Sequence, residues 1–166
     1  AYKLLAYHYQ YLKADSTDYY MHQFAELLPE ITNPFHHTWF FYNMGDILVQ
    51  KERYDEARAY LFKSIRLLEE YKLTTIDIYQ FSYYLLSNAA EAEGRLEEAI
   101  EYCEIAKDAS IKINTKSNTA YFMGKLSDLY ALAGDYKAAL EYYKEFSEIN
   151  NIIEVERNER SLRESE

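Results

Sequence analysis

The sequence is short of the residues that make tight turns and cross-links. Its 166 residues include only 4 Gly, 2 Pro and 1 Cys. An all-β fold needs frequent turns rich in Gly and Pro, so this scarcity favours a helical chain. The single cysteine, Cys103, excludes an internal disulfide. It therefore suits a reducing compartment and predicts a cytoplasmic location.

Long apolar runs and an excess of positive charge are also missing. No run of 18 apolar residues occurs, so we expect no membrane insertion. The 18 Lys and Arg against 28 Asp and Glu give a formal net charge of −10. Nucleic-acid binding without sequence preference needs cations that replace phosphate counterions, and an anionic membrane surface also attracts cations. The charge argues against both partners.

Hydrophobic and aromatic residues, in contrast, are abundant. The hydrophobic fraction is 49%, too high for a disordered chain, and 19 Tyr, 8 Phe and 1 Trp are present. So many aromatic rings must lie in a core or on a binding face. The chain starts at Ala1 without an initiator Met, so we expect it to be a piece of a longer protein.

Three segments of the chain repeat one pattern of residue types. Their alanines, Ala57, Ala99 and Ala139, are 42 and 40 residues apart. Each segment has two stretches of 3.6-residue apolar spacing around a short polar break, which predicts a helical hairpin.

The recurring small residues have a physical reason. Gly45, Ser87 and Ser127 stand at equivalent places in the first helices, where we expect the second helix to approach closely. Gly94 and Gly134 follow first helices, at a place where a left-handed backbone is most easily adopted by glycine.

These residues resemble the tetratricopeptide repeat family. The stretch Gly134-Asp135-Tyr136-Lys137-Ala138-Ala139-Leu140-Glu141-Tyr142-Tyr143 follows the family pattern most closely, and Tyr54-Asp55-Glu56-Ala57 and Leu96-Glu97-Glu98-Ala99 match its turn. The units run longer than the ~34 residues usual in the family. The resemblance covers about Thr38 to Ile149. It implies an all-α, right-handed α-solenoid of about four helix-turn-helix hairpins with a charged C-terminal helix.

This reading divides the chain into three parts. Residues 1–33 are predicted to form a degenerate hairpin, and residues 34–149 three repeats at about 38–73, 80–113 and 120–149. Asn33 and Pro34 predict the helix start that opens the first repeat. Residues 150–166 are predicted to form a charged helix. It either caps the array or leads toward a further domain, as the similar junctions in bacterial diguanylate cyclases and sensor kinases do.

No catalytic motif is present in the sequence. It lacks a Gly-rich phosphate loop, a Gly-x-Ser-x-Gly elbow, a His-Glu-x-x-His pair and a Cys-x-x-Cys pair. His36 and His37 are adjacent, so on a helix they point about 100° apart and do not share a metal. We therefore expect no enzyme activity, no metal and no cofactor, and a core position for Cys103.

The resemblance also indicates a binding surface. In the family, the first helices of successive repeats line a concave groove. Carried over residue by residue, the groove positions are Trp39, Tyr42, Asn43, Asp46, Val49, Phe81, Tyr84, Leu85, Asn88, Tyr121, Lys125 and Asp128. A second interpretation stays open, in which the aromatic rings among them only stack on neighbouring repeats.

The charges at these positions restrict the partner. Lys125 is the one cation among them, while Asp46 and Asp128 are acidic. We therefore expect a protein or peptide ligand that is neutral, apolar or basic rather than an acidic C-terminal tail. A homodimer through the aromatic face or the last helix is a further expectation.

These expectations combine into one predicted function. It is a protein- or peptide-binding module, the sensory or scaffolding region of a larger bacterial signalling protein. The alternative is a free-standing adaptor or a regulator that binds a peptide signal.

Overall fold

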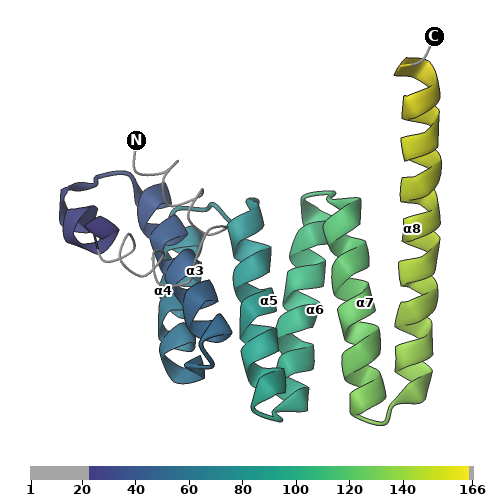
Figure 1. Ribbon diagram of the computed structural model, residues 1–166, viewed down its shortest axis with the longest axis horizontal. Helices are drawn as coiled ribbons and strands as arrows, with labels where there is room; N and C mark the ends of the chain where they lie inside the picture. The colour runs from purple at the N-terminus through teal and green to yellow at the C-terminus, as the bar shows by residue number, and fades with distance from the viewer. Residues whose placement is uncertain (1–22, 165–166) are drawn as a thin grey trace. The chain divides into compact units, whose positions relative to one another are not determined.

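The computed structural model describes residues 23–164, and all regular structure within that range is helical (Figure 1). The chain forms two compact units, residues 1–72 and 73–166. Most of the hairpin predicted at residues 1–33 lies outside the described residues. Its described part is helical over residues 23–27 and in the 3₁₀ turn η1 (Leu28–Glu30).

The described α-helices form three hairpins, and the predicted all-α repeat fold is confirmed. The first unit holds one hairpin, α3 (Pro34–Gln50) with α4 (Tyr54–Glu70). The second unit holds the other helices, which pack in sequence order: α5 (Asp77–Ala92), α6 (Leu96–Lys112), α7 (Lys116–Leu132) and α8 (Tyr136–Glu164).

Close approach at the small residues is confirmed in every hairpin. A Cβ atom added to Gly45 would lie 2.5 Å from a leucine side chain of α4, so no larger residue fits there without movement. Ser87 Oγ donates to the carbonyl of Ala99 at 2.7 Å. Ser127 Oγ donates to the carbonyl of Ala139 at 2.9 Å. The serines are small enough for the contact and also tie the two helices together.

The predicted glycine positions at the ends of the first helices are also observed. Gly94 and Gly134 have φ of 74° and 82°, so the predicted left-handed conformation is confirmed. Glu52 takes the equivalent place in the first hairpin with φ of 58°. At the start of α3, Asn33 accepts from the backbone N–H of Phe35 at 3.0 Å and Pro34 is the first helical residue, as predicted.

The C-terminal segment differs from the separate helix that was expected. Residues 150–164 continue α8 without a break, so α8 is 29 residues long and extends past the start of α7 (Figure 1). The reason is local: neither Gly nor Pro, the strongest residues for ending a helix, occurs between Tyr136 and Glu164. The charged segment is therefore the distal half of the second helix of the third hairpin.

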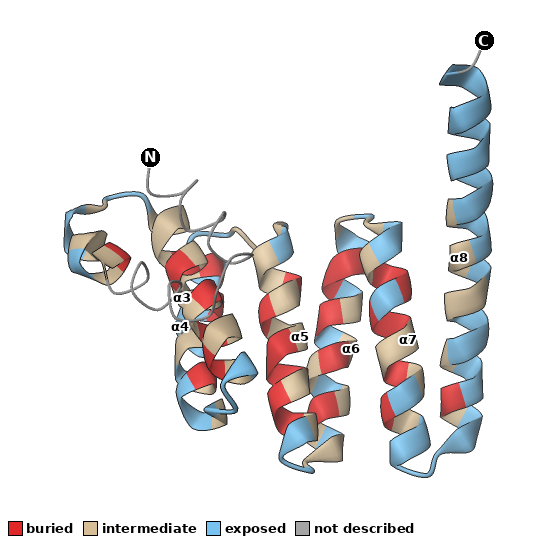
Figure 2. Cartoon of the chain, viewed as in Figure 1, coloured by how far each residue is buried: buried red, intermediate tan, exposed pale blue. Residues whose placement is uncertain are grey.

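The core of the second unit lies between α5, α6 and α7. Its buried residues include Ala99, Cys103 and Ala106 of α6 and Phe122 and Leu126 of α7. Burial raises the pKa of the Cys103 thiol to about 12, as expected for a small core residue. Figure 2 shows the contrast with α8, whose distal half is exposed on nearly every side.

Candidate functional site

Helices α5 and α7 of the second unit share one surface, along which three pairs of side chains meet. Asn118 reaches toward Asp77, the hydroxyl of Tyr84 meets that of Tyr121, and Lys125 forms an ion pair with Glu91. Successive pairs lie one or two helical turns apart, so they follow the helix axes. We call the surface defined by these six residues the Tyr84–Tyr121 face.

Two tyrosine rings form the middle of this face. Their hydroxyl oxygens are 2.5 Å apart, so one donates to the other, and their ring centroids are 5.1 Å apart. Both rings lie on Phe122, which is buried, while Tyr121 is 50% exposed. Partial burial and the hydrogen bond with Tyr84 raise the pKa of Tyr121 to about 12. The pair is an uncharged, amphipathic platform that rests on the core and is open to a partner.

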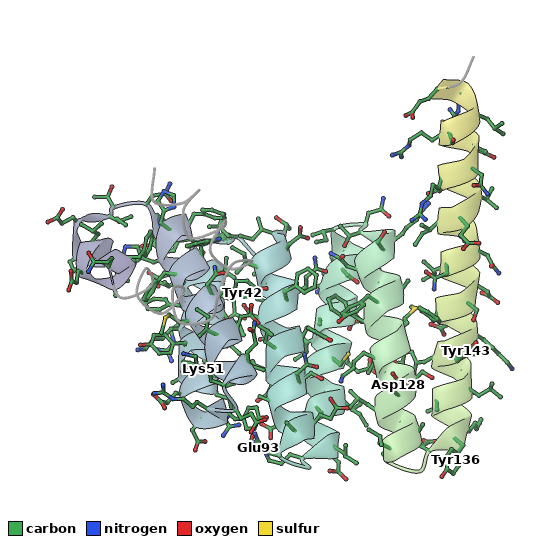
Figure 3. All side chains as sticks on the ribbon, viewed as in Figure 1. Tyr42, Lys51, Glu93, Asp128, Tyr136 and Tyr143 are labelled. Atoms are coloured by element: carbon green, nitrogen blue, oxygen red, sulfur yellow. The ribbon has the colours of Figure 1, made fainter. Side chains whose placement is uncertain are left out.

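The cation predicted for this face is already neutralised. Lys125 Nζ binds a carboxylate oxygen of Glu91, and both side chains are less than a third exposed. Asp128, one turn further along α7, is exposed (Figure 3). Among the six residues that define the face, the one cation, Lys125, is therefore already paired with a carboxylate.

At its other end, the face opens into a cleft of about 620 Å³ beneath the distal half of α8. Asp77 and Asn118 belong to both the face and the cleft, so the two surfaces are continuous. On the α8 side, the cleft is lined by Ile153, Glu156, Arg157 and Arg160. Across it, Lys116 pairs with Glu156.

The predicted residues of α5 and α7 are only partly brought together. Phe81 packs edge-on against Phe122, with ring centroids 5.6 Å apart, and supports the platform from below. Asn88 is half-buried, and its side chain forms no hydrogen bond with any other described residue. Leu85 is buried, with 7% of its surface exposed, so a ligand on this face cannot reach it. Its inclusion is corrected, because its position on α5 points into the packing.

The predicted residues of α3 belong to the first unit and are mainly structural. Asn43 is buried and its amide donates to the carbonyl of Trp39 at 2.7 Å, so it is not a groove residue. Trp39 packs edge-on against Phe24 at 5.8 Å, in line with the alternative interpretation of its ring. Burial, together with the charge of Asp46, raises the pKa of Tyr42 well above its usual value.

Two further α3 positions remain near the surface. Asp46 is half-buried and accepts from the amide of Gln50 at 3.1 Å. Val49 is also half-buried. Neither contributes to the Tyr84–Tyr121 face.

Arg157 and Arg160 are cleft residues that sequence reasoning missed. Neither forms an ion pair with another described residue. The signal was present, because Ile153, Arg157 and Arg160 recur at helical spacing on one side of α8. A separate helix over residues 150–166 would not place these arginines beside the start of α7, whereas the continuous α8 does.

A second group of tyrosines lies where α6, α7 and α8 meet, and we call it the Glu104 cluster. Tyr130 and Tyr142 stack with ring centroids 5.5 Å apart and planes 11° apart. Both hydroxyls donate to Glu104 Oε1, at 3.4 and 2.5 Å respectively. Lys107 donates to Glu104 Oε2 at 3.0 Å and lies 5.5 Å from the Tyr142 ring centroid. Every polar group of this cluster has a partner.

Residues 23–164 contain neither a cluster of metal-ligating side chains nor a membrane-spanning helix. No group of three or more His, Cys, Asp or Glu residues there is placed to hold a metal ion. No helix in the same range is both long and apolar enough to cross a membrane.

Successive hairpins of paired helices, each with a small residue at the contact between its two helices, define a helical repeat protein. Two sequence profiles described as tetratricopeptide repeat match residues 40–69 and 79–151, together more than half of the chain. The chain belongs to the tetratricopeptide repeat family.

Individual relatives resemble the chain more distantly. "Tetratricopeptide repeat protein 29" of Trypanosoma brucei brucei is 33% identical over 77 residues, which is 45% of this chain and 16% of that protein. The chain thus corresponds to a small part of that relative's length. The apo form of RapI superposes with a TM-score of 0.82 at 14% identity, over 92% of this chain and 56% of that one. The TPR domain of Arabidopsis FLU gives 0.65 at 17% identity, over 72% and 99%. These likenesses show the shared fold.

Proposed function

We propose that this chain is a protein- or peptide-binding module and that its ligand lies along the Tyr84–Tyr121 face. The observation that carries the proposal is the tyrosine pair itself, which packs on the buried ring of Phe122 and leaves Tyr121 half exposed. Tyrosine gives a large contact area at little conformational cost, and it is enriched where binding energy is concentrated. The role is binding rather than catalysis.

The charges of the face support a neutral, apolar or basic ligand. Glu91 neutralises Lys125, and Asp128 is exposed beside them. An acidic segment over this part of the face would meet repulsion from Asp128 and no free cation. A basic or apolar segment would meet neither problem.

A selection from a random peptide library on the immobilised chain tests this proposal. The affinity of a selected peptide is then measured by fluorescence polarisation for the wild type, Tyr121→Ala and Tyr71→Ala. Tyr71 is 49% exposed, close to the 50% of Tyr121, so it is a matched control. We expect Tyr121→Ala to weaken binding by roughly tenfold or more and Tyr71→Ala to leave it unchanged.

Two results would contradict the proposal. One is a selection that enriches no peptide. The other is a selected peptide that binds Tyr121→Ala as well as the wild type, while circular dichroism shows the same helix content for both proteins.

The wider setting that we propose is the sensory or scaffolding region of a larger bacterial signalling protein. It is supported by α8, because one unbroken helix that leaves the last hairpin is a rigid connection. The alternative is a free-standing adaptor or a regulator that binds a peptide signal. The reading frame beyond the codon for Glu166 distinguishes them: an in-frame output domain supports the larger protein, and an early stop codon supports the alternative.

A further inference from the structure

The outer side of α8 carries exposed apolar side chains whose counterparts in α6 are buried or partly buried against the core. The repeat period of 40 residues aligns Tyr136, Leu140 and Tyr143 of α8 with Leu96, Ile100 and Cys103 of α6. In α6 this row faces the next helix: Cys103 is buried, and its thiol donates to the carbonyl of Phe122 in α7 at 3.6 Å. In α8 the three side chains are 53–75% exposed. Figure 3 labels two of them, Tyr136 and Tyr143.

The distal half of α8 poses the complementary problem, because most of its surface is exposed to solvent. From Glu154 to Glu164 every residue is exposed, including Val155 and Leu162. An isolated helical segment of this length is marginal in water. The ion pair of Arg163 with Glu159 within it, at 3.6 Å, is exposed and adds little stability.

We propose that two copies of this chain pair through their α8 helices, which run antiparallel, so that the distal half of each covers the Tyr136–Tyr143 row of the other. This arrangement places a helix where α7 lies against α6, in the same antiparallel direction. One symmetric contact then covers both exposed surfaces of both copies, as an isologous dimer requires.

The sequence of α8 fits a two-fold axis near Ile149. Tyr143 and Val155 lie six residues on either side of it, and Tyr136 and Leu162 lie thirteen. In an antiparallel pair, residues equally far from the axis stand at the same level, so Tyr143 meets Val155 and Tyr136 meets Leu162. Each of these pairs occurs twice in the dimer.

The charges of α8 select the same register. With the axis at Ile149, Lys144 stands level with Glu154, five residues on either side. Sliding one copy by four residues, about one turn, brings Glu148 level with Glu154, or Lys137 level with Arg157 in the other direction. Both shifts bring like charges together, which disfavours them.

Light scattering at concentrations up to roughly 100 µM tests the dimer, since this range detects even a weak association. We expect twice the chain mass of 19.8 kDa for the wild type and 19.8 kDa for Tyr143→Glu. Ile111→Glu is the matched control, because Ile111 is a 52% exposed apolar residue on α6, and it should stay dimeric. A wild type of single-chain mass, or a Tyr143→Glu variant that remains dimeric, overturns the proposal.

Two further measurements test the register. Lys144→Glu should raise the dimer dissociation constant by roughly tenfold, and adding Glu154→Lys should restore it. Under oxidation, Tyr143→Cys with Val155→Cys should give covalent dimers. Tyr143→Cys with Leu162→Cys should not, because those levels are about 10 Å apart and exceed the reach of a disulfide. Equal cross-linking of the two variants, or failed restoration, rejects this pairing.

Discussion

Two tyrosine pairs in the second unit show how the same side chain serves different purposes. Tyr130 and Tyr142 stack on each other, and both hydroxyls are held by Glu104. Among residues 23–164, the hydroxyls of Tyr84 and Tyr121 form a hydrogen bond with each other and with no other side chain, and Tyr121 is half exposed. The first pair connects α7 and α8 to the Glu104 carboxylate of α6, so it contributes to the stability of the fold. The second pair leaves its outer surface exposed, which is why we propose that it binds the ligand.

The largest expected difference follows removal of one ring from each pair. Tyr142→Ala removes a stacked ring and a hydrogen bond to Glu104, so we expect unfolding to need about 3 kcal/mol less. Tyr121→Ala removes a half-exposed ring, and we expect a loss of about 1 kcal/mol or less. Urea unfolding followed by circular dichroism measures both changes. Equal losses would erase the distinction between the pairs.

Substitution of the acidic residue beside each pair, Glu104 or Glu91, should give a smaller difference in stability of the same sign. Glu104→Gln weakens three hydrogen bonds of the Glu104 cluster, including the charge-assisted bond from Lys107, and we expect a loss of about 2 kcal/mol. Glu91→Gln breaks a single ion pair near the surface, so the expected loss is about 0.5 kcal/mol. The same urea titrations give both values. A larger loss of stability for Glu91→Gln than for Glu104→Gln would contradict the assignment of the stabilising role to the Glu104 cluster.

Acid should remove the contribution of the Glu104 cluster in a defined direction. Burial alone would raise the pKa of Glu104, but the hydrogen bonds from Tyr142 and Lys107 outweigh it and hold the pKa below the ordinary value of 4.5. The folded state therefore binds the proton more weakly than the unfolded state, and the stabilisation is full above the unfolded pKa. It is lost as the pH falls through the folded pKa.

This pH dependence can be isolated by difference. We expect the stability gap between wild type and Glu104→Gln to be widest near neutral pH and to narrow as the pH falls below 4.5. Urea titrations of both proteins at several pH values between neutrality and that range measure the gap. A gap that stays constant on acidification would mean that Glu104 contributes through its shape rather than its charge.

The fold could be predicted because its determinants are local and repeat. Gly45, Ser87 and Ser127 are small because the second helix of the same hairpin packs closely against each of them. Helix starts and the left-handed glycines are likewise decided within a few residues of sequence. The sequence does not predict the continuity of α8, because its composition changes from apolar to charged near residue 150 although the helix continues. A helix ends through its backbone and caps, which the composition does not reveal.

The site was harder to predict because it depends on which face of each helix its neighbours cover. Leu85 and Asn43 stand in the sequence as plausible groove residues, yet both are buried. Arg157 and Arg160 meet the start of α7 only because α8 extends past it. Periodicity gives the direction of a side chain on its own helix. It does not give the angle at which the next helix packs, and that angle decides exposure.

The smallest expected effect concerns the hydroxyl group of Tyr121. Its hydrogen bond with Tyr84 is short, at 2.5 Å, but it lies at the surface, where water can replace either partner. We expect Tyr121→Phe to change the free energy of unfolding by about 0.5 kcal/mol or less, whereas Tyr142→Phe leaves Glu104 short of a donor and loses about 1 kcal/mol or more.

If the ring of Tyr121 carries the binding, Tyr121→Phe should also retain peptide affinity within about threefold, while Tyr121→Ala loses it. A selected peptide that tolerates Tyr121→Ala but not Tyr121→Phe would contradict this, and a loss in both variants would assign the recognition to the hydroxyl pair. Polarisation titrations of the same peptide against the three proteins therefore separate the contact area of the ring from its polar group.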